Sequence, residues 1–462
     1  MLSKSSIKDL SSILTSKNIL ISKEECYCYA QDSTNTRKPT KIPNAVVFVE
    51  SIKDIQNVLK YANSNHISIV SRGAGTNMVG ACTCQENSIV MNFSKMNKIL
   101  EFDPINMSMK VQPGVVVDDI KKIAESKGLY FPPDPSNFKV STIGGGIAQA
   151  SGGAKSFKYG TIKDYILSLT LVLADGTIMK TGAGTVKDAV GYHLSQLMVG
   201  SEGTLAVIAE AELKLIPKPE ANALITAYFD SMSDAVKGVN SIIESRVFPS
   251  TIDFMDKNAI NTVENFCPSG LIREKDCMLL IEIEDFAYGL ENQAIKIKNA
   301  LKGSSASNVN IVFDNEQKER IWIARRASYA AVTQLAPDVV TDDIIVPRSS
   351  LADMVDACRI ICEKYKLKTC FVGHVGDGNI HPQIALNLDD EKEFRNYMDA
   401  KAEIYDMVTN LGGTISAEHG IGIEKIDYIK DTLDDVAIEY MKRIKKTFDP
   451  NNILNPGKIF RI

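Results

Sequence analysis

Short apolar runs alternate with amphipathic segments along the first part of the chain. Residues 45–51 and 67–73 are runs of strand length rich in Val and Ile, and residues 52–65 between them repeat apolar positions at helical spacing. This order predicts a β-α-β unit. Further strands are expected at 88–93 and 107–114, a helix and a proline-rich loop at 116–136, and a hairpin around Asp175-Gly176 within 165–182.

The pattern changes after Pro219, where a second block of elements begins. Apolar runs of strand length alternate there with amphipathic helices, and a longer helix is expected at about 391–411. A last helix and loop follow from about residue 437. The pattern predicts three segments, at 1–219, 220–411 and 412–462, with the second packed on the first and the tail returning to it.

Composition excludes some classes of function. With 462 residues the chain is long enough for two or three domains, and the formal net charge of −5 gives no global basic field for nucleic acid. No apolar run reaches the length of a membrane span, and the first twenty residues lack the apolar core of a signal peptide. We expect a cytoplasmic protein.

The nine cysteines favour the same compartment. Their number is odd, and their spacings match neither a zinc finger nor an iron–sulfur run. Free thiols in a reducing cytoplasm are the better interpretation. Electron chemistry in this chain would then need an external carrier.

Two of the five histidines flank a turn-forming stretch, Phe371–Leu386, "FVGHVGDGNIHPQIAL". If Asp377-Gly378 is a two-residue type I′ turn, His374 and His381 pair directly across a hairpin, with Cβ atoms roughly 5 Å apart. Two imidazoles at that separation could share one divalent ion, and a third ligand should then exist elsewhere. The alternative is two structural histidines on a polar sheet face.

Two glycine-rich stretches could hold a phosphate-bearing or planar ligand through backbone N–H groups. Residues 70–80 follow a strand but do not have the spacing of a dinucleotide-binding Rossmann turn, and residues 141–160 contain a second dense run. Each could also be an ordinary tight loop. The two runs together with "VGSEGTLAVI" (199–208) make a cofactor site the better hypothesis.

These motifs occur together in a known family. "RGAGTNMVG", "PPDPS", "STIGGGIAQASGG", "KYG", "LADGT" and "VGSEGTLAVI" resemble the FAD-binding domain of the vanillyl-alcohol oxidase (p-cresol methylhydroxylase, PCMH) superfamily. "GHVGDGNIHP", "AEHGIG" and "NPGK" resemble the C-terminal half of the FAD-linked D-2-hydroxyacid dehydrogenases. That group includes D-lactate dehydrogenases, the glycolate oxidase flavin subunit and D-2-hydroxyglutarate dehydrogenase. The likeness is strongest to soluble D-lactate dehydrogenases of anaerobic bacteria, some of which work with electron-transfer flavoprotein.

The resemblance implies an α+β fold and a set of cofactor contacts. Residues 1–219 would form a two-subdomain PCMH-type FAD-binding domain, 220–411 an α/β cap domain with an antiparallel sheet for the substrate, and 412–462 a C-terminal helical segment. FAD would be noncovalent, because neither glycine-rich stretch carries the His or Cys that covalent members use. The implied cofactor residues are Arg72, Gly73, Ala74, Gly75, Thr76, Asn77, Gly80, Pro133, Ser141, Thr142, Gly144, Gly145, Gly152, Gly160, Glu202, Gly203, Ile208 and Asn455.

The "AEHGIG" stretch would supply the missing metal ligand and a base. Glu418 with His374 and His381 forms a two-His, one-carboxylate set with open positions for Zn, Fe or Mn. His419 would take the hydroxyl proton as general base. Adjacent residues reach one site only at an irregular junction, which Gly420 and Gly422 permit.

One arginine of the tandem in "IWIARRASYAA" would hold the substrate carboxylate. The family's substrate Arg lies three residues after a Trp, which selects Arg325 after Trp322 rather than Arg326. D-2-hydroxyglutarate enzymes carry a Lys about fifteen residues after this Arg, where Thr341 stands here. This departure weakens the interpretation of a dicarboxylate substrate.

We therefore expect an FAD- and metal-dependent D-lactate dehydrogenase that passes electrons to electron-transfer flavoprotein, or alternatively to an iron–sulfur subunit. A glycolate oxidase flavin subunit and D-2-hydroxyglutarate dehydrogenase are the alternatives within flavin chemistry. A flavin-free zinc hydrolase built on the same metal residues is the alternative from a different class.

Overall fold

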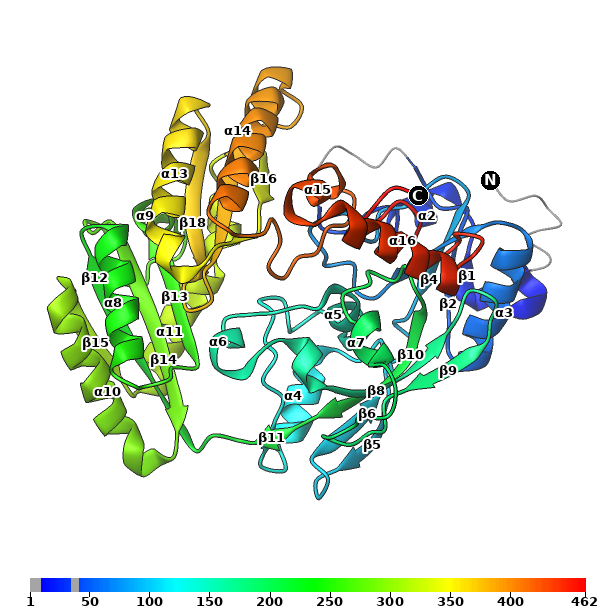
Figure 1. Ribbon diagram of the computed structural model, residues 1–462, viewed down its shortest axis with the longest axis horizontal. Helices are drawn as coiled ribbons and strands as arrows, with labels where there is room; N and C mark the ends of the chain where they lie inside the picture. Colours follow the sequence, from blue (N-terminus) through cyan, green and yellow to red (C-terminus); the bar gives the residue numbers. More distant parts are fainter. Residues whose placement is uncertain (1–9, 35–40) are drawn as a thin grey trace.

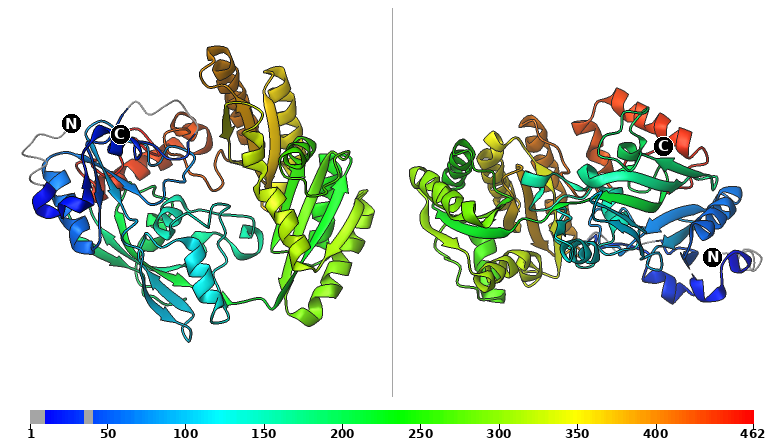
Figure 2. Two further views of the ribbon diagram at one scale, coloured as in Figure 1. Left: turned by 180° about the vertical axis from the view of Figure 1, so that it is seen from behind. Right: turned by 90° about the horizontal axis from the view of Figure 1, so that it is seen from below.

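The chain forms two lobes that face each other, and the C-terminal segment belongs to the first of them. The computed structural model describes residues 10–34 and 41–462. The N-terminal lobe holds two larger sheets and a two-stranded one, and the second lobe holds one large sheet with helices on both faces (Figure 1). The chain crosses between the lobes after β11 (Ile216–Pro217) and returns through residues 412–428 (Figures 1 and 2).

The first sheet of the N-terminal lobe contains the expected β-α-β unit. Its strands are ordered β1 (Ile19–Leu20), β2 (Ala45–Phe48), β4 (Ser88–Asn92) and β3 (Ser68–Arg72), and β4 lies between the two strands of the unit and parallel to both. Helix α3 (Ile52–Ser64) begins at Ser51, whose hydroxyl accepts the Asp54 N–H, and its apolar stripe is buried.

The second sheet is antiparallel, in the order β5 (Ile99–Asp103), β6 (Ser108–Val111), β10 (Val207–Lys214), β8 (Ile166–Val172) and β9 (Ile178–Thr181). The hairpin predicted around Asp175-Gly176 is confirmed as β8 and β9. Helices α4 (Val117–Glu125), α5 (Ile143–Gln149) and α7 (Leu194–Met198) pack on this sheet.

Part of the second glycine-rich stretch is a helix rather than a loop. Three glycines lie within α5, which packs against the loop at Pro113. A Cβ on Gly144 would come within 2.6 Å of the Pro113 side chain, and one on Gly146 within 2.9 Å of Ile162. The glycines therefore permit a close approach of the helix, at a cost in helix propensity.

The cap domain is built on one eight-stranded antiparallel sheet. Its order is β15 (Ser307–Val312), β12 (Ala221–Phe229), β14 (Cys277–Asp285), β13 (Thr251–Asp256), β18 (Lys368–His374), β19 (Asn379–Leu386) and β16 (Asp338–Thr341), with β17 (Ile344–Ile345) also on β19. One face is covered by α8 (Met232–Glu244), α10 (Ala287–Leu301), α13 (Leu351–Lys364) and α14 (Glu391–Asn410). The other face packs against α9 (Lys257–Phe266), α11 (Asn315–Arg326) and α12 (Ser328–Val332).

The α11 face of this sheet is apolar at one end and polar at the other. Its apolar half forms one core with α9, α11 and α12. Alternation along each strand puts a row of polar side chains on the same face, at the end that meets the N-terminal lobe. The row runs through Glu284, Glu282, Thr251, Asp253, His374, His381 and Gln383.

The tail completes the first lobe. The Ile69 N–H of β3 donates to the Ile453 carbonyl, and the Asn455 N–H donates to the Ile69 carbonyl. Helix α16 (Asp435–Phe448) buries Lys445, whose Nζ donates to the carbonyls of Thr204 and Leu454 at 2.8 Å. Residues 453–455 are thus buried in the lobe in which the chain began.

The remaining elements are short: α2 (Lys23–Tyr27), β7 (Leu129–Tyr130), α6 (Ser156–Tyr159), α15 (Ile429–Thr432) and 3-10 turns at Ser16–Asn18, Ile162–Tyr165, Lys302–Ser304, Arg348–Ser350 and Ile426–Tyr428. None of the helices within 10–34 and 41–462 is both long and apolar enough to cross a bilayer. All nine cysteines are free thiols, as expected. Helical spacing of apolar residues at the start of the chain predicts a helix, and the first nine residues of that stretch lie outside the described residues.

Candidate active site

The histidine hairpin exists, but its predicted register is wrong. His381 pairs with Val372, and His374 pairs with Asn379. The turn spans His374–Asp377, closed by the Asp377 N–H on the His374 carbonyl at 2.9 Å, and Gly378 follows with φ of +88°. The error is two residues, a full strand period, so both imidazoles stay on one face as diagonal neighbours. Their ring centroids are 5.3 Å apart.

Glu418 completes the cluster from the C-terminal segment. Its Oε1 lies 3.6 Å from His374 Nε2 and 3.3 Å from His381 Nε2. Ligand atoms at about 2.0–2.2 Å from one ion are separated by roughly 3.0–3.5 Å in common geometries. The three side chains that the sequence proposed as ligands therefore converge with spacings that suit one divalent ion.

A buried carboxylate stands behind His374. Asp253, on the neighbouring strand β13, lies with Oδ1 2.6 Å from His374 Nδ1, and its Oδ2 is ion-paired with Arg325 Nε at 2.9 Å. Burial opposes the charged imidazolium, but Asp253 and Glu418 outweigh it and raise the pKa of His374 well above its ordinary value. Such a carboxylate–histidine pair orients a metal-binding imidazole and fixes its tautomer.

The Glu418 loop is held by a second buried carboxylate, Asp343. Its Oδ2 accepts the Ser416 hydroxyl at 3.0 Å and the backbone N–H groups of residues 417–419 at 2.8–2.9 Å. The loop is irregular, with φ of +87° at Gly420 and +53° at Gly422. Glu418 and His419 therefore both line one cavity, as the sequence predicted for an irregular junction.

A second four-residue group also has its donor atoms within 4.8 Å of one another, namely Asp343, His381, Glu418 and His419. Both Asp343 oxygens are already engaged, because Oδ1 accepts Asn379 Nδ2 at 2.8 Å and Oδ2 accepts four donors. His374, His381 and Glu418 are thus the better ligand set, and Asp343 supports them. His419 lies beside the set, with Nε2 4.0 Å from Glu418 Oε1, and burial lowers the pKa of its imidazole.

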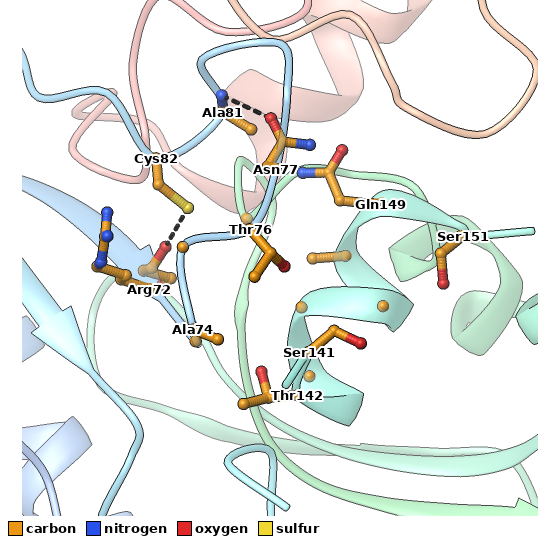
Figure 3. A pocket seen from close by; sticks show the side chains of 18 of the residues that line it. Arg72, Ala74, Thr76, Asn77, Ala81, Cys82, Ser141, Thr142, Gln149 and Ser151 are labelled. Carbon is orange, nitrogen blue, oxygen red and sulfur yellow. Dashed lines mark hydrogen bonds between the residues drawn. The ribbon is translucent and has the colours of Figure 1, made fainter. Parts of the chain in front are cut away.

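A large cavity leads from this cluster into the N-terminal lobe. It has an empty volume of about 1240 Å³, and its lining includes Arg72 to Asn77, the α5 segment, and finally Glu418 and His419. Thr76 and Asn77 from the first glycine-rich loop, and Thr142 and Gln149 from the α5 segment, surround this space (Figure 3). The cavity therefore joins the proposed cofactor loops to the proposed metal site.

The lining fits a polar, extended cofactor such as FAD. Ser141 Oγ, Thr142 Oγ1, Gln149 Oε1 and Ser151 Oγ are buried and have no hydrogen-bond partner among the described residues. Buried polar atoms in proteins are nearly always satisfied, so a ligand with donors and acceptors is expected beside them. Glycine-rich backbone on the facing loop supplies further N–H groups for phosphate.

The structure places thirteen of the eighteen proposed cofactor residues on the cavity wall. These are Arg72, Gly73, Ala74, Gly75, Thr76, Asn77, Ser141, Thr142, Gly144, Gly145, Glu202, Gly203 and Ile208. The other five, Gly80, Pro133, Gly152, Gly160 and Asn455, lie off the wall.

For three of these five residues, the structure shows why this residue type occupies the position. A Cβ on Gly152 would lie 2.7 Å from Glu418 Oε2, and one on Gly80 would lie 2.4 Å from Ile423. Asn455 Nδ2 donates to the carbonyls of Ala81 and Glu202 at 2.9 and 2.7 Å, so it ties together two segments that do line the cavity.

Sequence reasoning missed two carboxylates that support the site, Asp253 and Asp343, and it named Glu202 only as a cofactor contact. Asp253 and Asp343 are fully buried, and the Glu202 carboxylate accepts the Ile421 and Gly422 N–H groups at 2.7 and 2.9 Å. Burial raises the pKa of Glu202 to about 7. Asp253 and Asp343 each stand within an apolar run of strand length. Because Asp is almost never fully buried unless it is paired, such a position could have indicated a buried carboxylate with a partner.

Comparisons with known proteins identify the family of the chain. The model for the C-terminal domain of FAD linked oxidases matches residues 218–459, and an FAD binding domain model matches 43–182. Glycolate oxidase subunit GlcD of Bacillus subtilis (strain 168) is 39% identical over 94% of this chain and 92% of its own length. D-lactate dehydrogenases of Anaerostipes hadrus and Archaeoglobus fulgidus are 33% and 34% identical, each over 90% of this chain and 89% and 91% of their own lengths.

The same fold occurs in p-cresol methylhydroxylase with substrate bound, with a TM-score of 0.83 at 16% identity over 99% of this chain and 96% of that one. This confirms the predicted α+β architecture of an FAD-binding domain and a cap domain. The family excludes the alternative of a flavin-free hydrolase. The chain belongs to the FAD linked oxidases, as an oxidoreductase of the D-lactate dehydrogenase and glycolate oxidase type.

Proposed function

We propose that the chain oxidises D-lactate to pyruvate, using noncovalently bound FAD and a divalent metal ion held by His374, His381 and Glu418. The observation that carries the proposal is the cavity that has the cofactor loops along its wall and Glu418 and His419 at its end. Because this cavity joins the cofactor loops to the proposed metal site, a small hydroxyacid bound to the metal would lie close to the cofactor.

In this proposal the bound FAD supplies a hydride acceptor and the metal ion a Lewis acid for the substrate hydroxyl. His419 Nε2 takes the hydroxyl proton, since it lies beside Glu418 Oε1 and since burial favours the neutral imidazole that a base requires. Asp343 keeps Glu418 and His419 in place through their backbone N–H groups.

Arg325 is the proposed anchor for the substrate carboxylate. It lies in the last turn of α11 and is ion-paired with Asp253, the residue behind His374. Only Nε of Arg325 contacts Asp253, so the other N–H groups of the guanidinium can bind a carboxylate of the substrate. Arg326 instead pairs with Glu319 on the surface, which supports the choice of Arg325.

Two neutral side chains next to His381 on the sheet, Gln383 and Thr341, support a substrate with a single carboxylate. Gln383 lies two residues along β19 on the same face, and Thr341 pairs with it from β16. Gln383 Oε1 and Thr341 Oγ1 are buried and unpartnered among the described residues, and neither side chain carries the positive charge that a second carboxylate would require. This arrangement favours lactate or glycolate over D-2-hydroxyglutarate.

Glycolate is the second candidate, because glycolate oxidase subunits are among the similar relatives and one of them is 39% identical, more than either D-lactate dehydrogenase. The test is anaerobic reduction of the purified flavoprotein by D-lactate, L-lactate, glycolate and D-2-hydroxyglutarate, followed by stopped-flow absorbance. D-lactate is expected to give the largest ratio of reduction rate constant to Kd. A larger ratio for glycolate would transfer the assignment to glycolate, and a yellow protein that none of the four bleaches would overturn the proposal.

For the electron acceptor we propose electron-transfer flavoprotein, with an iron–sulfur subunit as the alternative. The nine free cysteines are not arranged for a cluster, so electrons must leave through another carrier. Free thiols also favour the reducing cytoplasm. In an anaerobic mixture with D-lactate, the flavin of the partner should become reduced. If it stays oxidised while the flavin of this chain is bleached, the acceptor is a different one.

A further inference from the structure

A buried ion cluster joins the two lobes beside the cofactor segment. Lys155 lies within the second glycine-rich stretch, with Nζ 3.1 Å from Glu282 Oε1 and in a shorter contact with Glu284 Oε1. Both acids belong to β14 of the cap domain, and their side chains are 7% and 5% exposed. We call Lys155, Glu282 and Glu284 the interlobe lock.

Two further side chains of the N-terminal lobe form hydrogen bonds with β14. Tyr159 OH donates to Glu284 Oε2 at 2.9 Å, and Lys158 Nζ donates to the Glu284 backbone carbonyl at 2.7 Å. The Lys155 N–H also donates to Asp134 Oδ1 at 3.2 Å. The lock is thus attached to the loop and the segment that line the cofactor cavity.

On the cap side the lock reaches the proposed substrate anchor. Glu282 Oε2 accepts Trp322 Nε1 at 2.8 Å, and Trp322 lies one turn before Arg325 on α11. Glu282 also pairs with Thr251 on β13, two residues before Asp253. A short path of contacts therefore runs from the cofactor segment through Lys155 and Glu282 to the helix that carries Arg325.

The charges explain why Lys155 is needed there. Glu282 and Glu284 project from the same face of one strand, where two buried carboxylates repel each other. Burial disfavours the ammonium group, but these carboxylates outweigh it and raise the pKa of Lys155. Beyond Lys155 the interface opens into a cavity with an empty volume of about 1510 Å³, bounded by Tyr130 and residues 218–222. The lock is therefore a packed contact between the catalytic cavity and the linker that joins the lobes.

We propose that Lys155 is a positioning residue for hydroxyacid oxidation: it locks the cap domain onto the cofactor segment and so sets the position of Arg325 and the metal ligands relative to the flavin. The inference rests on the proposed function and adds to it the part of the chain that aligns the two lobes. A displacement of about 1 Å between reacting groups is enough to slow a reaction about 10²-fold.

The experiment compares Lys155→Met with Lys155→Arg and with Lys158→Met in the full-length flavoprotein. Lys158→Met is the matched control, because it removes a lysine from the same interface without leaving a carboxylate unpaired. Lys155→Met is expected to keep FAD and metal, to be reduced by dithionite like the wild type, and to be reduced by D-lactate about 10- to 100-fold more slowly. Lys155→Arg should restore most of the rate, and Lys158→Met should stay within about threefold of the wild type.

Hydrogen–deuterium exchange supplies a readout that needs no substrate. In Lys155→Met, amides of α6 and of α11 around Trp322 should exchange faster, whereas those of α3 should not. Wild-type kinetics and exchange in Lys155→Met would overturn the proposal, and so would loss of FAD or an equal defect in Lys158→Met. If no hydroxyacid reduces the wild type, the proposed function fails, while the exchange data still decide whether the lock holds the lobes together.

Discussion

Asp343 should be the residue on which the geometry of the catalytic loop depends most. Its side chain is fully buried, and it accepts five hydrogen bonds from Asn379, Ser416 and the backbone of residues 417–419. Asp343→Ala removes all five acceptor contacts. Asp343→Asn keeps one oxygen for the four loop donors, but its NH₂ group faces Asn379 Nδ2, a donor that also binds the Ile344 carbonyl, so the contact with Asn379 is lost.

The expected magnitudes follow from the charge of the acceptor. A hydrogen bond to a charged group contributes about 1.5–3 kcal/mol, but loop N–H groups regain water when the loop moves, so the five do not add. Breaking a buried charged network by removing one member costs about 3–5 kcal/mol, which is the loss of unfolding free energy expected for the Ala variant. The Asn variant loses the charge and the hydrogen bond from Asn379 but keeps the loop contacts, so roughly 2–3 kcal/mol is expected.

The kinetic effect should be larger than the stability effect suggests, because both Glu418 and His419 move with the loop. We expect flavin reduction by D-lactate to slow at least about 10²-fold in Asp343→Ala and about tenfold in Asp343→Asn. Stopped-flow absorbance gives the rate, elemental analysis the metal content, and hydrogen exchange the protection of residues 416–422. An Ala variant with wild-type rate, metal content and protection would refute the claim that this carboxylate positions the loop.

Three further predictions concern the histidines. His419→Ala should keep FAD and metal but slow flavin reduction by about 10²–10⁴-fold, and reduction at the wild-type rate would remove His419 from the role of base. His374→Ala and His381→Ala should each lose the divalent metal by elemental analysis, and full metal content in either would contradict a shared ion. Because burial lowers the pKa of His419 below its ordinary value of 6.5, the base is neutral near pH 7. The rate constant for flavin reduction should therefore be constant from about pH 7 to 9 and fall only as the pH drops below about 6.5. A rate constant that already falls as the pH is lowered from about 9 to 7 would contradict this.

Local pattern was sufficient for most of the elements and for placing His374 and His381 on one face of a hairpin. The β-α-β unit, the Asp175-Gly176 hairpin and the alternation of strands and helices after Pro219 follow from hydrophobic periodicity and turn residues, which act over a few neighbouring positions. The irregular junction at Glu418-His419 followed from its glycines, because Gly420 and Gly422 adopt positive φ.

Tertiary structure alone decided the register, the strand order and the long-range partners. The face of the hairpin was predicted correctly, but its register was not. Side chains alternate between the two faces of a strand, so a shift of two residues leaves the face unchanged. Strand β4 entered between β2 and β3 from later in the chain. The pairings of Asp253 with His374, Asp343 with residues 416–419 and Lys155 with Glu282 join positions 73 or more residues apart. No periodic signal connects such positions, since the first contact depends on the strand order of the cap sheet, the second on the returning tail and the third on the packing of the two lobes.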